Sequence, residues 1–351
     1  MLTRSRHQFL RRVSVCAVAS QKFNFAYAQS AAMSSVMMKT AQVKEFGAPE
    51  SIQVHETTRP VPKAGQVLVK IKAAGVNPVE TYIRSGQYAH LPPLPWTPGK
   101  DAAGIVEDIG SDGTEGSRAT KSENDEDICE LSRYVVVKAD GHHEHDDHDH
   151  DHDHDDLGGN RTAIENPYRN KNWLEKGARV WTPMAQGAAS QYAIVNRHEL
   201  FELPEHLSFF QGAALGVPYR TAYKALFIKG AAKAKPGNSI LIHGASGAVG
   251  VALMQFAKAI GMSPIIATAG TNQGIQVCDF NGADYVLNHK QENHLQQLNS
   301  ILELRNRPVR NKGVDLIIEN CATANLGEDV KYLQRGGVVV VVGLKKIVQN
   351  H

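Results

Sequence analysis

The sequence predicts an α/β protein in which a mainly β module precedes a doubly wound parallel sheet. An apolar strand at residues 239–242 runs through the glycine-rich segment 243–250 into an apolar helix that continues to residue 260. Beyond that helix, strand-like and helical stretches alternate, which is the order of parallel strands joined by right-handed crossovers. From Lys39 to Ile109, apolar and polar residues alternate between turn-forming Gly and Pro, which is typical of antiparallel β structure.

The individual elements follow from the same patterns. In the first half, strands are predicted near residues 41–43, 52–54, 67–71, 102–109, 176–181 and 190–195, and helices at 211–215 and 219–227. In the second half, the strand at 239–242 is followed by strands at 264–269, 283–287, 314–319 and 338–342, with helices at 271–280, 291–304 and 326–334 between them.

The glycine-rich turn is the first candidate site. Gly244, Gly247 and Gly250 allow a tight turn and a close approach of the backbone to a pyrophosphate. The helix that follows offers free N–H groups and the positive end of its dipole. The spacing G-x-x-G-x-x-G differs from the commoner G-x-G-x-x-G, so an ordinary strand-to-helix turn remains an alternative.

The end of the second parallel strand bears on the choice of cofactor. An enzyme that uses NAD would place Asp or Glu there to bind the ribose 2′-hydroxyl. This strand ends instead in Thr268, Ala269 and Gly270, without an acid. The absence of a repelling carboxylate favours NADP(H). No Arg or Lys stands near in the sequence, so indifference between the two cofactors also remains open.

Composition limits the classes of function. A net charge of +2 over 351 residues indicates neither a nucleic-acid-binding nor a membrane-surface protein. No apolar run approaches the roughly 20 residues of a membrane-spanning helix. The four cysteines are scattered and form no C-x-x-C pair, which fits a reducing compartment and excludes a cysteine zinc ribbon.

The N-terminal segment is expected to lie outside the fold. Residues 1–38 contain Arg and Lys but no acid, which is typical of a mitochondrial transit peptide. Two alternatives remain. Residues 13–19 resemble a short signal-peptide core, and a start at Met33, Met37 or Met38 would leave a cytoplasmic protein.

Residues 111–172 interrupt the globular pattern. They are rich in Ser, Asp, Glu and Asn and contain a run of alternating His and acidic residues at 142–156. Such a segment buries too little apolar surface to offset its ordering entropy, so a disordered insertion with unselective affinity for Zn, Ni or Cu is expected. The strand-like residues 134–137 inside it are interpreted as a stray element.

Four stretches in order, at residues 74–86, 97–104, 216–223 and 243–250, resemble the zeta-crystallin-like quinone oxidoreductases of the medium-chain dehydrogenase/reductase superfamily. The resemblance covers residues 39–345 apart from the insertion. It implies a GroES-like catalytic domain at 39–215, a Rossmann NADP-binding domain at 216–351 and an active site between them. The implied reaction is hydride transfer from NADPH to a quinone or an enone.

The resemblance also implies a reaction without zinc. Zinc-dependent members carry Gly-His-Glu where this chain has Gly99, Lys100 and Asp101, and they carry cysteine ligands that are missing here. No metal site is therefore expected in the cleft. Hydride addition to a quinone gives a delocalised anion, which needs less electrophilic assistance.

The resemblance assigns roles to individual residues. Asn77 and Tyr82 would line the nicotinamide and substrate cleft, where the Tyr82 hydroxyl would donate a hydrogen bond to the substrate carbonyl. A packed aromatic role for Tyr82, an exposed loop role for His289 and a solvated role for Lys345 are the alternatives. The cofactor contacts would come from Tyr82, Ser246, Gly247, Ala248, Val249, Gly270, His289, Asn325, Val342, Gly343, Leu344 and Lys345.

Two departures from the family pattern give further expectations. The insertion is foreign to the family, and the family continues beyond the end of this chain, so the sequence resembles a truncated or alternatively spliced product or a faulty gene model. Without the family's sixth strand, residues 338–342 would form an exposed apolar edge and the usual homo-oligomer would be doubtful. RNA binding, which no basic cluster supports, and a catalytically impaired remnant are the alternative functions.

Overall fold

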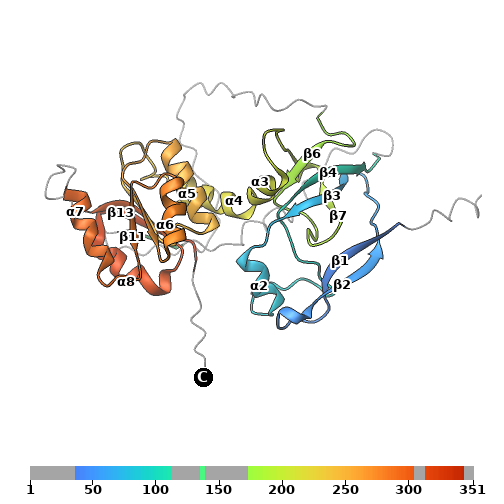
Figure 1. The fold of residues 1–351 in the computed structure, drawn as a ribbon, viewed down its shortest axis with the longest axis horizontal. Helices are drawn as coiled ribbons and strands as arrows, with labels where there is room; N and C mark the ends of the chain where they lie inside the picture. The colour runs from blue at the N-terminus through green and yellow to red at the C-terminus, as the bar shows by residue number, and fades with distance from the viewer. Residues whose placement is uncertain (1–35, 112–134, 139–172, 304–312, 344–351) are drawn as a thin grey trace, which may run out of the picture.

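The structure is a computed structural model, and it describes residues 36–111, 135–138, 173–303 and 313–343. Figure 1 shows two bodies, a mainly β body with α2 (Pro78–Arg84) and a sheet flanked by helices, with α3 (Phe209–Ala214) and α4 (Val217–Tyr223) between them. Within the described residues, no helix is long and apolar enough to cross a membrane.

The first body is built on an antiparallel five-stranded sheet of order β7-β3-β4-β6-β8, with a separate hairpin of β1 (Met37–Val43) and β2 (Ile52–Thr58). Alternate side chains of its strands, such as Val67, Val69 and Val195, form the core. The strands of the sheet are β3 (Gln66–Ala74), β4 (Ala102–Ile109), β6 (Arg179–Thr182), β7 (Tyr192–Asn196) and β8 (Phe201–Glu202).

The second body is the doubly wound sheet that the alternating pattern predicts. Its five parallel strands have the order β11-β10-β9-β12-β13, so β9, the first of the five in sequence, lies at the centre. This order places the topological switch point between β9 and β12, where doubly wound folds bind their ligands. The strands are β9 (Ile240–Ile242), β10 (Ile265–Ala269), β11 (Tyr285–Asn288), β12 (Val314–Glu319) and β13 (Leu333–Val341).

Helices cover both faces of this sheet. Ile240 and Ile242 pack on one face with α5 (Ala248–Ala259), whereas Leu241 belongs to the core of the other face. The remaining elements are α6 (Asn272–Phe280), η6 (His294–Gln296), α7 (Gln297–Glu303), α8 (Ala322–Tyr332) and a π-helical segment η5 (Lys224–Lys229) that extends α4. The helix expected at 326–334 thus begins four residues earlier and ends two earlier.

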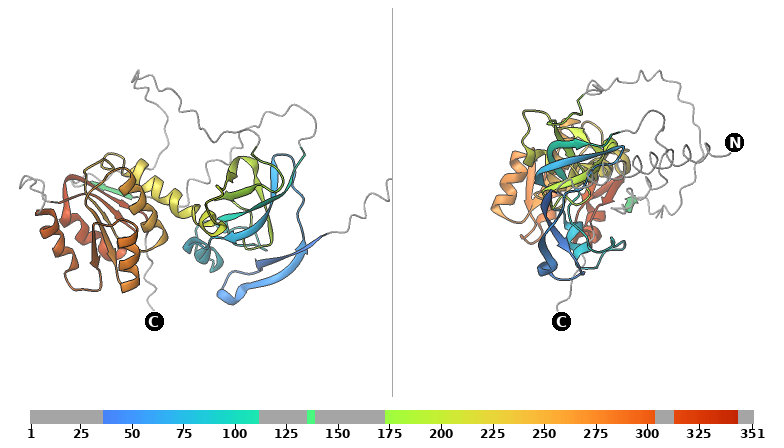
Figure 2. Two further views of the ribbon diagram at one scale, coloured as in Figure 1. Left: turned by 45° about the horizontal axis from the view of Figure 1, so that its top comes forward. Right: turned by 90° about the vertical axis from the view of Figure 1, so that its right-hand side faces the viewer.

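The expectation of an exposed edge at residues 338–342 is wrong for the strand itself. A sixth strand, β5 (Val135–Lys138), pairs antiparallel with β13 in the register Val338↔Lys138 to Val341↔Val135. Figure 2 shows this green strand lying within the red and orange body. The segment interpreted as a stray element therefore covers the edge, because the outer N–H and C=O groups of β13 need a partner. The rest of the insertion, including 142–156, lies outside the described residues.

Candidate functional site

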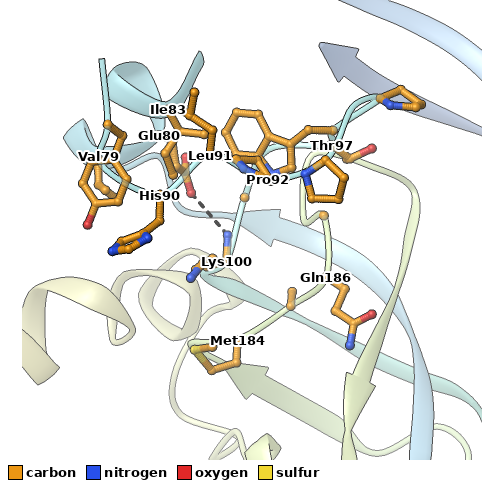
Figure 3. A pocket seen from close by; sticks show the side chains of 17 residues that line it. Val79, Glu80, Ile83, His90, Leu91, Pro92, Thr97, Lys100, Met184 and Gln186 are labelled. Carbon is orange, nitrogen blue, oxygen red and sulfur yellow. Dashed lines mark hydrogen bonds between the residues drawn. The ribbon is translucent and has the colours of Figure 1, made fainter. Parts of the chain in front are cut away.

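The β body contains a cavity of about 740 Å³ beside α2. Its walls are mostly apolar and come from α2, the proline-rich loop at residues 91–99 and the turn before β7. Leu91, Trp96 and Met184 are among the lining side chains. Figure 3 shows Lys100 and Glu80 among these apolar groups. An apolar cavity with a few polar groups is the usual form of a small-molecule site.

Glu80 holds the backbone around this cavity. Its Oε2 accepts a hydrogen bond from the Asn77 N–H at 3.3 Å, which caps α2, and its Oε1 accepts one from the Lys100 N–H at 3.2 Å. The residue is 7% exposed, and burial raises the pKa of its carboxyl group. Both carboxylate oxygens are thus occupied by backbone donors.

Asp101 joins the cavity floor to the start of α4. Its two oxygens accept from the Val217 N–H at 3.0 and 2.9 Å, and Oδ2 also accepts from Asn77 Nδ2 at 2.9 Å. The carboxylate therefore acts as an N-terminal cap supplied from a distant strand. A Cβ on Gly216 would overlap this carboxylate, so only glycine fits there.

Lys100 lies between these two acids but pairs with neither of them in the described part of the chain. Its side chain is half buried and lines the cavity. Burial lowers the pKa of its ammonium group, and the neighbouring Arg220 charge lowers it further. The ammonium is therefore an unpaired positive charge at an apolar cavity.

The glycine-rich turn forms a second site at the carboxyl edge of the parallel sheet. Gly244 has φ +60°, a conformation that favours glycine, and its N–H donates to Thr268 Oγ1 at 3.1 Å. A Cβ on Gly250 would overlap the backbone of Ala245, which explains the close approach of helix and turn. Helix α5 begins after Gly247 without a side-chain cap, so its first N–H groups are available to an anion.

Two family models match the chain. The alcohol dehydrogenase GroES-like domain matches residues 63–205, and the zinc-binding dehydrogenase model matches residues 248–350. Human quinone oxidoreductase is 36% identical over 315 residues, which cover 89% of this chain and 75% of the human protein. The mouse quinone oxidoreductase is 37% identical over 311 residues, which cover 88% of this chain and 74% of the mouse protein.

The chain belongs to the quinone oxidoreductase branch of the medium-chain dehydrogenase/reductase superfamily. This confirms the resemblance and the predicted class of enzyme. Among solved structures, the quinone oxidoreductase of Escherichia coli in complex with NADPH aligns with a TM-score of 0.59. It is 26% identical, and the match covers 85% of this chain and 71% of the bacterial one. The predicted GroES-like and Rossmann architecture is confirmed.

The zinc of the dehydrogenase family does not fit the residues of this oxidoreductase's cavity. The position of a zinc-binding His is taken by Lys100, whose ammonium repels a cation. The carboxylate of Asp101 already accepts hydrogen bonds from Val217 and Asn77. A metal ion would have to displace these contacts and would uncap α4.

Neither of the two residues expected to touch substrate lines this cavity. Asn77 is 5% exposed, and its side chain orients Asp101 rather than lining the cavity. Tyr82 is 44% exposed on α2 and is not among the lining residues, whereas Val79, Glu80 and Ile83 on the same helix are. In the sequence, Lys100 is visible only as the residue at a zinc-ligand position, next to Asp101; its proximity to Glu80 appears only in the fold.

The predicted cofactor residues gather at the edge of the parallel sheet. Ser246, Gly247 and Ala248 are exposed there, and Val249 and Gly250 follow in the first turn of α5. His289 follows β11 and lies against Gly270, where a Cβ would overlap the imidazole. Burial lowers the pKa of this imidazole, with the Lys290 charge adding to the effect.

Lys290 is a basic residue that the sequence around Gly270 does not reveal, because it follows the end of the next strand along the chain. Asn288 pairs with Ala269 across β10 and β11, so Gly270 and His289 directly follow paired strand ends, and Lys290 comes one residue later. Lys290 is exposed. The fold therefore supplies the cation that the local sequence lacks.

The remaining predicted contacts lie on the other side of the switch point. A Cβ on Gly343 would lie 2.6 Å from the Asn320 carbonyl oxygen, so the chain passes close to the end of β12. The Val342 N–H donates to the Glu319 carbonyl at 2.8 Å, and Asn325 is half buried in α8. Leu344 and Lys345 lie outside the described residues.

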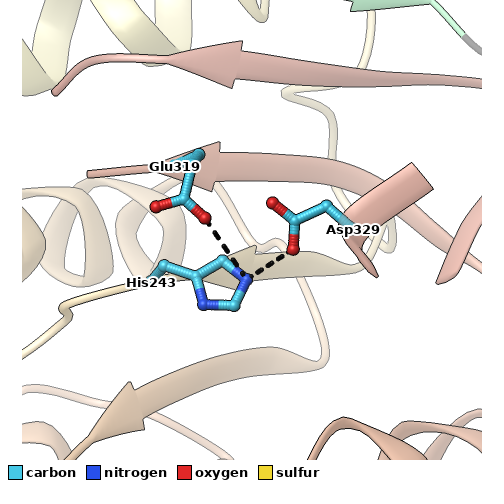
Figure 4. A group of neighbouring side chains, drawn as sticks. All are labelled: His243, Glu319 and Asp329. Atoms are coloured by element: carbon cyan, nitrogen blue, oxygen red, sulfur yellow. Dashed lines mark hydrogen bonds and ion pairs between the residues drawn. The ribbon is translucent and has the colours of Figure 1, made fainter. Parts of the chain in front are cut away.

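Beneath the glycine-rich turn lies a buried cluster of His243, Glu319 and Asp329 (Figure 4). The His243 Nε2 atom lies 2.8 Å from Asp329 Oδ1 and 3.7 Å from Glu319 Oε2. Within the described residues, Glu319 Oε2 and Asp329 Oδ2 have no hydrogen-bond partner. The cluster is closed off from solvent, and burial raises the pKa of Glu319 to about 7.

Proposed function

We propose that this chain reduces quinones and related enones by hydride transfer from NADPH, without a catalytic metal ion. The observation that carries the proposal is an apolar cavity whose described surroundings contain an ammonium group without an ion-pair partner and no set of zinc ligands. The same fold has a glycine-lined helix N-terminus without a side-chain cap. The E. coli relative, whose structure is a complex with NADPH, supports the choice of cofactor.

The turn at residues 244–250 would hold the pyrophosphate. The exposed Ser246 and the first N–H groups of α5 supply hydrogen-bond donors, and the helix dipole favours the negative charge. When bound, the dinucleotide supplies the hydride. The protein contributes by placing the substrate, excluding water and stabilising the charge that develops on the substrate.

NADPH is the expected partner over NADH because Lys290 brings a positive charge to the end of the second strand, where no acid competes. The lowered pKa of His289 leaves its imidazole mostly neutral at pH 7, so the lysine carries the charge there. We expect Lys290→Met to narrow the ratio of NADH to NADPH dissociation constants measured by titration calorimetry. An unchanged ratio would remove Lys290 from the argument.

A reversal of the cofactor preference, from NADPH to NADH, needs two substitutions. Gly270→Asp would place a carboxylate at the ribose, but its Cβ overlaps the His289 ring. The double variant Gly270→Asp with His289→Ala clears that space, and we expect it to favour NADH. A preference for NADPH in this variant would contradict the assignment of the strand end to the ribose.

The pyrophosphate site can be tested by charge alone. Gly247 has φ −78°, and a Cβ there would lie 3.4 Å from the Gly244 oxygen, an ordinary contact. Gly247→Asp adds an anion at the helix N-terminus, and Gly247→Asn is its neutral control of the same shape. We expect the aspartate variant to bind NADPH about tenfold more weakly than the asparagine variant, through like-charge repulsion.

The activity itself is tested with purified protein, NADPH and a panel of quinones and enones, followed by the loss of NADPH absorbance. Turnover that persists after exhaustive chelation with EDTA is the expected result. Activity that disappears with EDTA and returns with zinc would overturn the metal-free proposal. Absence of turnover with every acceptor would overturn the proposed reaction.

A further inference from the structure

We propose that Lys100 is a catalytic residue, whose ammonium binds the substrate oxygen that becomes anionic and then donates a proton to it. The proposal rests on the proposed function, because it names the group that completes that reduction. Lys100 lines the cavity from its floor, and Figure 3 shows its side chain among the apolar lining residues.

The backbone of Lys100 is fixed on both sides. Its N–H donates to Glu80 Oε1 at 3.2 Å, and its carbonyl accepts from the Ala185 N–H at 2.8 Å. The preceding Gly99 has φ +101°, and a Cβ there would lie 2.8 Å from the Ala188 Cβ. A loop held in this way presents the lysine at a constant position, which is what a group that must meet a reacting atom requires.

The ammonium lacks the partner that a structural lysine would have. The nearest acids are Glu80 and Asp101, and their oxygens accept from the amides of Asn77, Lys100 and Val217. No ion pair of Lys100 occurs in the described ranges, and Glu199 acts on it only as a more distant charge. A half-buried cation without a counter-ion favours an anionic ligand.

The charged surroundings suit proton donation. Burial lowers the pKa of the Lys100 ammonium, and the positive charge of Arg220 acts in the same direction. Glu80, Asp101 and Glu199 oppose the shift. His90 and Tyr88 are the other titratable groups that line the cavity. A lysine with a lowered pKa releases its proton more readily than a free lysine.

In the proposed reduction, bound NADPH would supply a hydride from its C4–H bond and would become NADP⁺, so the substrate would gain two electrons. An enone becomes an enolate and a quinone becomes a quinol anion. One N–H bond of the Lys100 ammonium then breaks while an O–H bond forms on the substrate. The neutral amine recovers its proton from water.

The first test uses a probe that needs no cofactor. The phenolate of 4-nitrophenol resembles a quinol anion, and its colour reports its ionisation. At a pH below the free probe's pKa, we expect the wild-type protein to increase the coloured fraction and Lys100→Met to abolish the increase. Lys100→Arg, which keeps the charge, should retain it, and Lys72→Met, an exposed lysine of β3, should leave it unchanged.

The second test is the pH profile of kcat. Lys100→Met should lower kcat on the order of 100-fold, the typical contribution of a general acid. In the wild type, kcat should fall as the pH rises through the lowered lysine pKa, and Lys100→Arg should lose this alkaline limb. NADPH affinity and thermal melting show that each variant is folded.

The outcomes separate the two proposals. Equal binding of nitrophenolate by wild type and Lys100→Met, or an unchanged kcat in Lys100→Met, overturns the role of Lys100. Absence of quinone and enone turnover by the wild type overturns the proposed function, and the catalytic role with it. The probe experiment then still shows whether the lysine binds an oxyanion.

Discussion

Replacement of Glu319 by Gln should change how the stability of the protein depends on pH. Glu319 is 0% exposed and shares its surroundings with Asp329 and His243. One of its oxygens accepts from the Cys321 N–H, and the other has no hydrogen-bond partner. Glutamine mimics the neutral carboxylic acid in shape, so the substitution removes the titration while it keeps the packing.

The magnitude follows from the pKa of Glu319, which burial raises from 4.5 to about 7. A carboxyl group with a higher pKa in the folded state holds its proton more tightly when folded. Its contribution to stability is therefore complete below pH 4.5 and is lost as the pH rises through about 7. A shift of this size corresponds to about 3 kcal/mol, at roughly 1.4 kcal/mol for each pH unit.

The assay is urea denaturation at constant ionic strength from pH 5 to pH 8. Relative to Glu319→Gln, the wild type should lose unfolding free energy across this range, by up to about 3 kcal/mol. Glu328→Gln is the matched control, because Glu328 precedes Asp329 in α8 but is exposed and pairs with Lys331 at the surface. Identical pH slopes for wild type and Glu319→Gln would refute the reasoning.

Three further outcomes are expected. Asp101→Ala should lower the unfolding free energy by about 1–3 kcal/mol, because it uncaps α4 and leaves the buried Asn77 amide without its acceptor. Chemical denaturation measures this loss, and Asp108→Ala at the surface is the control; a smaller loss for Asp101→Ala than for the control would contradict the reasoning. Gly250→Ala should abolish NADPH binding by separating α5 from the turn at Ala245, whereas the exposed Gly327→Ala in α8 should bind normally; calorimetry distinguishes them. Replacement of the β5 residues by Gly and Ser should uncover the edge of β13 and so promote aggregation, which light scattering on storage measures. A variant as monodisperse as the wild type would show that β5 does not protect that edge.

The parallel sheet could be predicted from the sequence because each strand contains a short, mostly apolar run between helical patterns. Such runs are typical of strands buried on both faces, as Val314–Glu319 proves to be. The right-handed crossover rule fixes the hand of each connection but not the order of the strands, which only the structure gives. Boundaries were less certain, because the helix over Ala322–Tyr332 begins with small and polar residues that carry no helical period.

The pairing of β5 with β13 could not be predicted because it joins segments that are distant in sequence. An antiparallel partner for a sheet edge can come from any strand-like stretch, and local pattern gives no information on which one is used. The buried cluster escaped notice for the same reason. His243 follows β9, Glu319 ends β12 and Asp329 lies in α8, so only the fold brings them together.

The helical phase of α2 explains why Tyr82 does not line the cavity. Val79, Glu80 and Ile83 face the cavity and occupy one side of the helix. Tyr82 immediately precedes Ile83, so it is turned by about 100° from that residue and reaches solvent. A resemblance in sequence transfers the position of a tyrosine, but the helix phase decides which surface it joins.

The replacement of zinc ligands by Lys100 and Asp101 has a chemical consequence for the choice of substrate. A zinc ion serves alcohol oxidation because it binds the alkoxide directly and lowers the pKa of the alcohol by many units. An ammonium group beside an apolar cavity supplies one positive charge and a proton, which is sufficient for an enolate or a quinol anion but not for an alkoxide. Asp101 holds the start of α4. Under the proposed function, these two positions suit the reduction of conjugated carbonyl compounds better than the oxidation of simple alcohols.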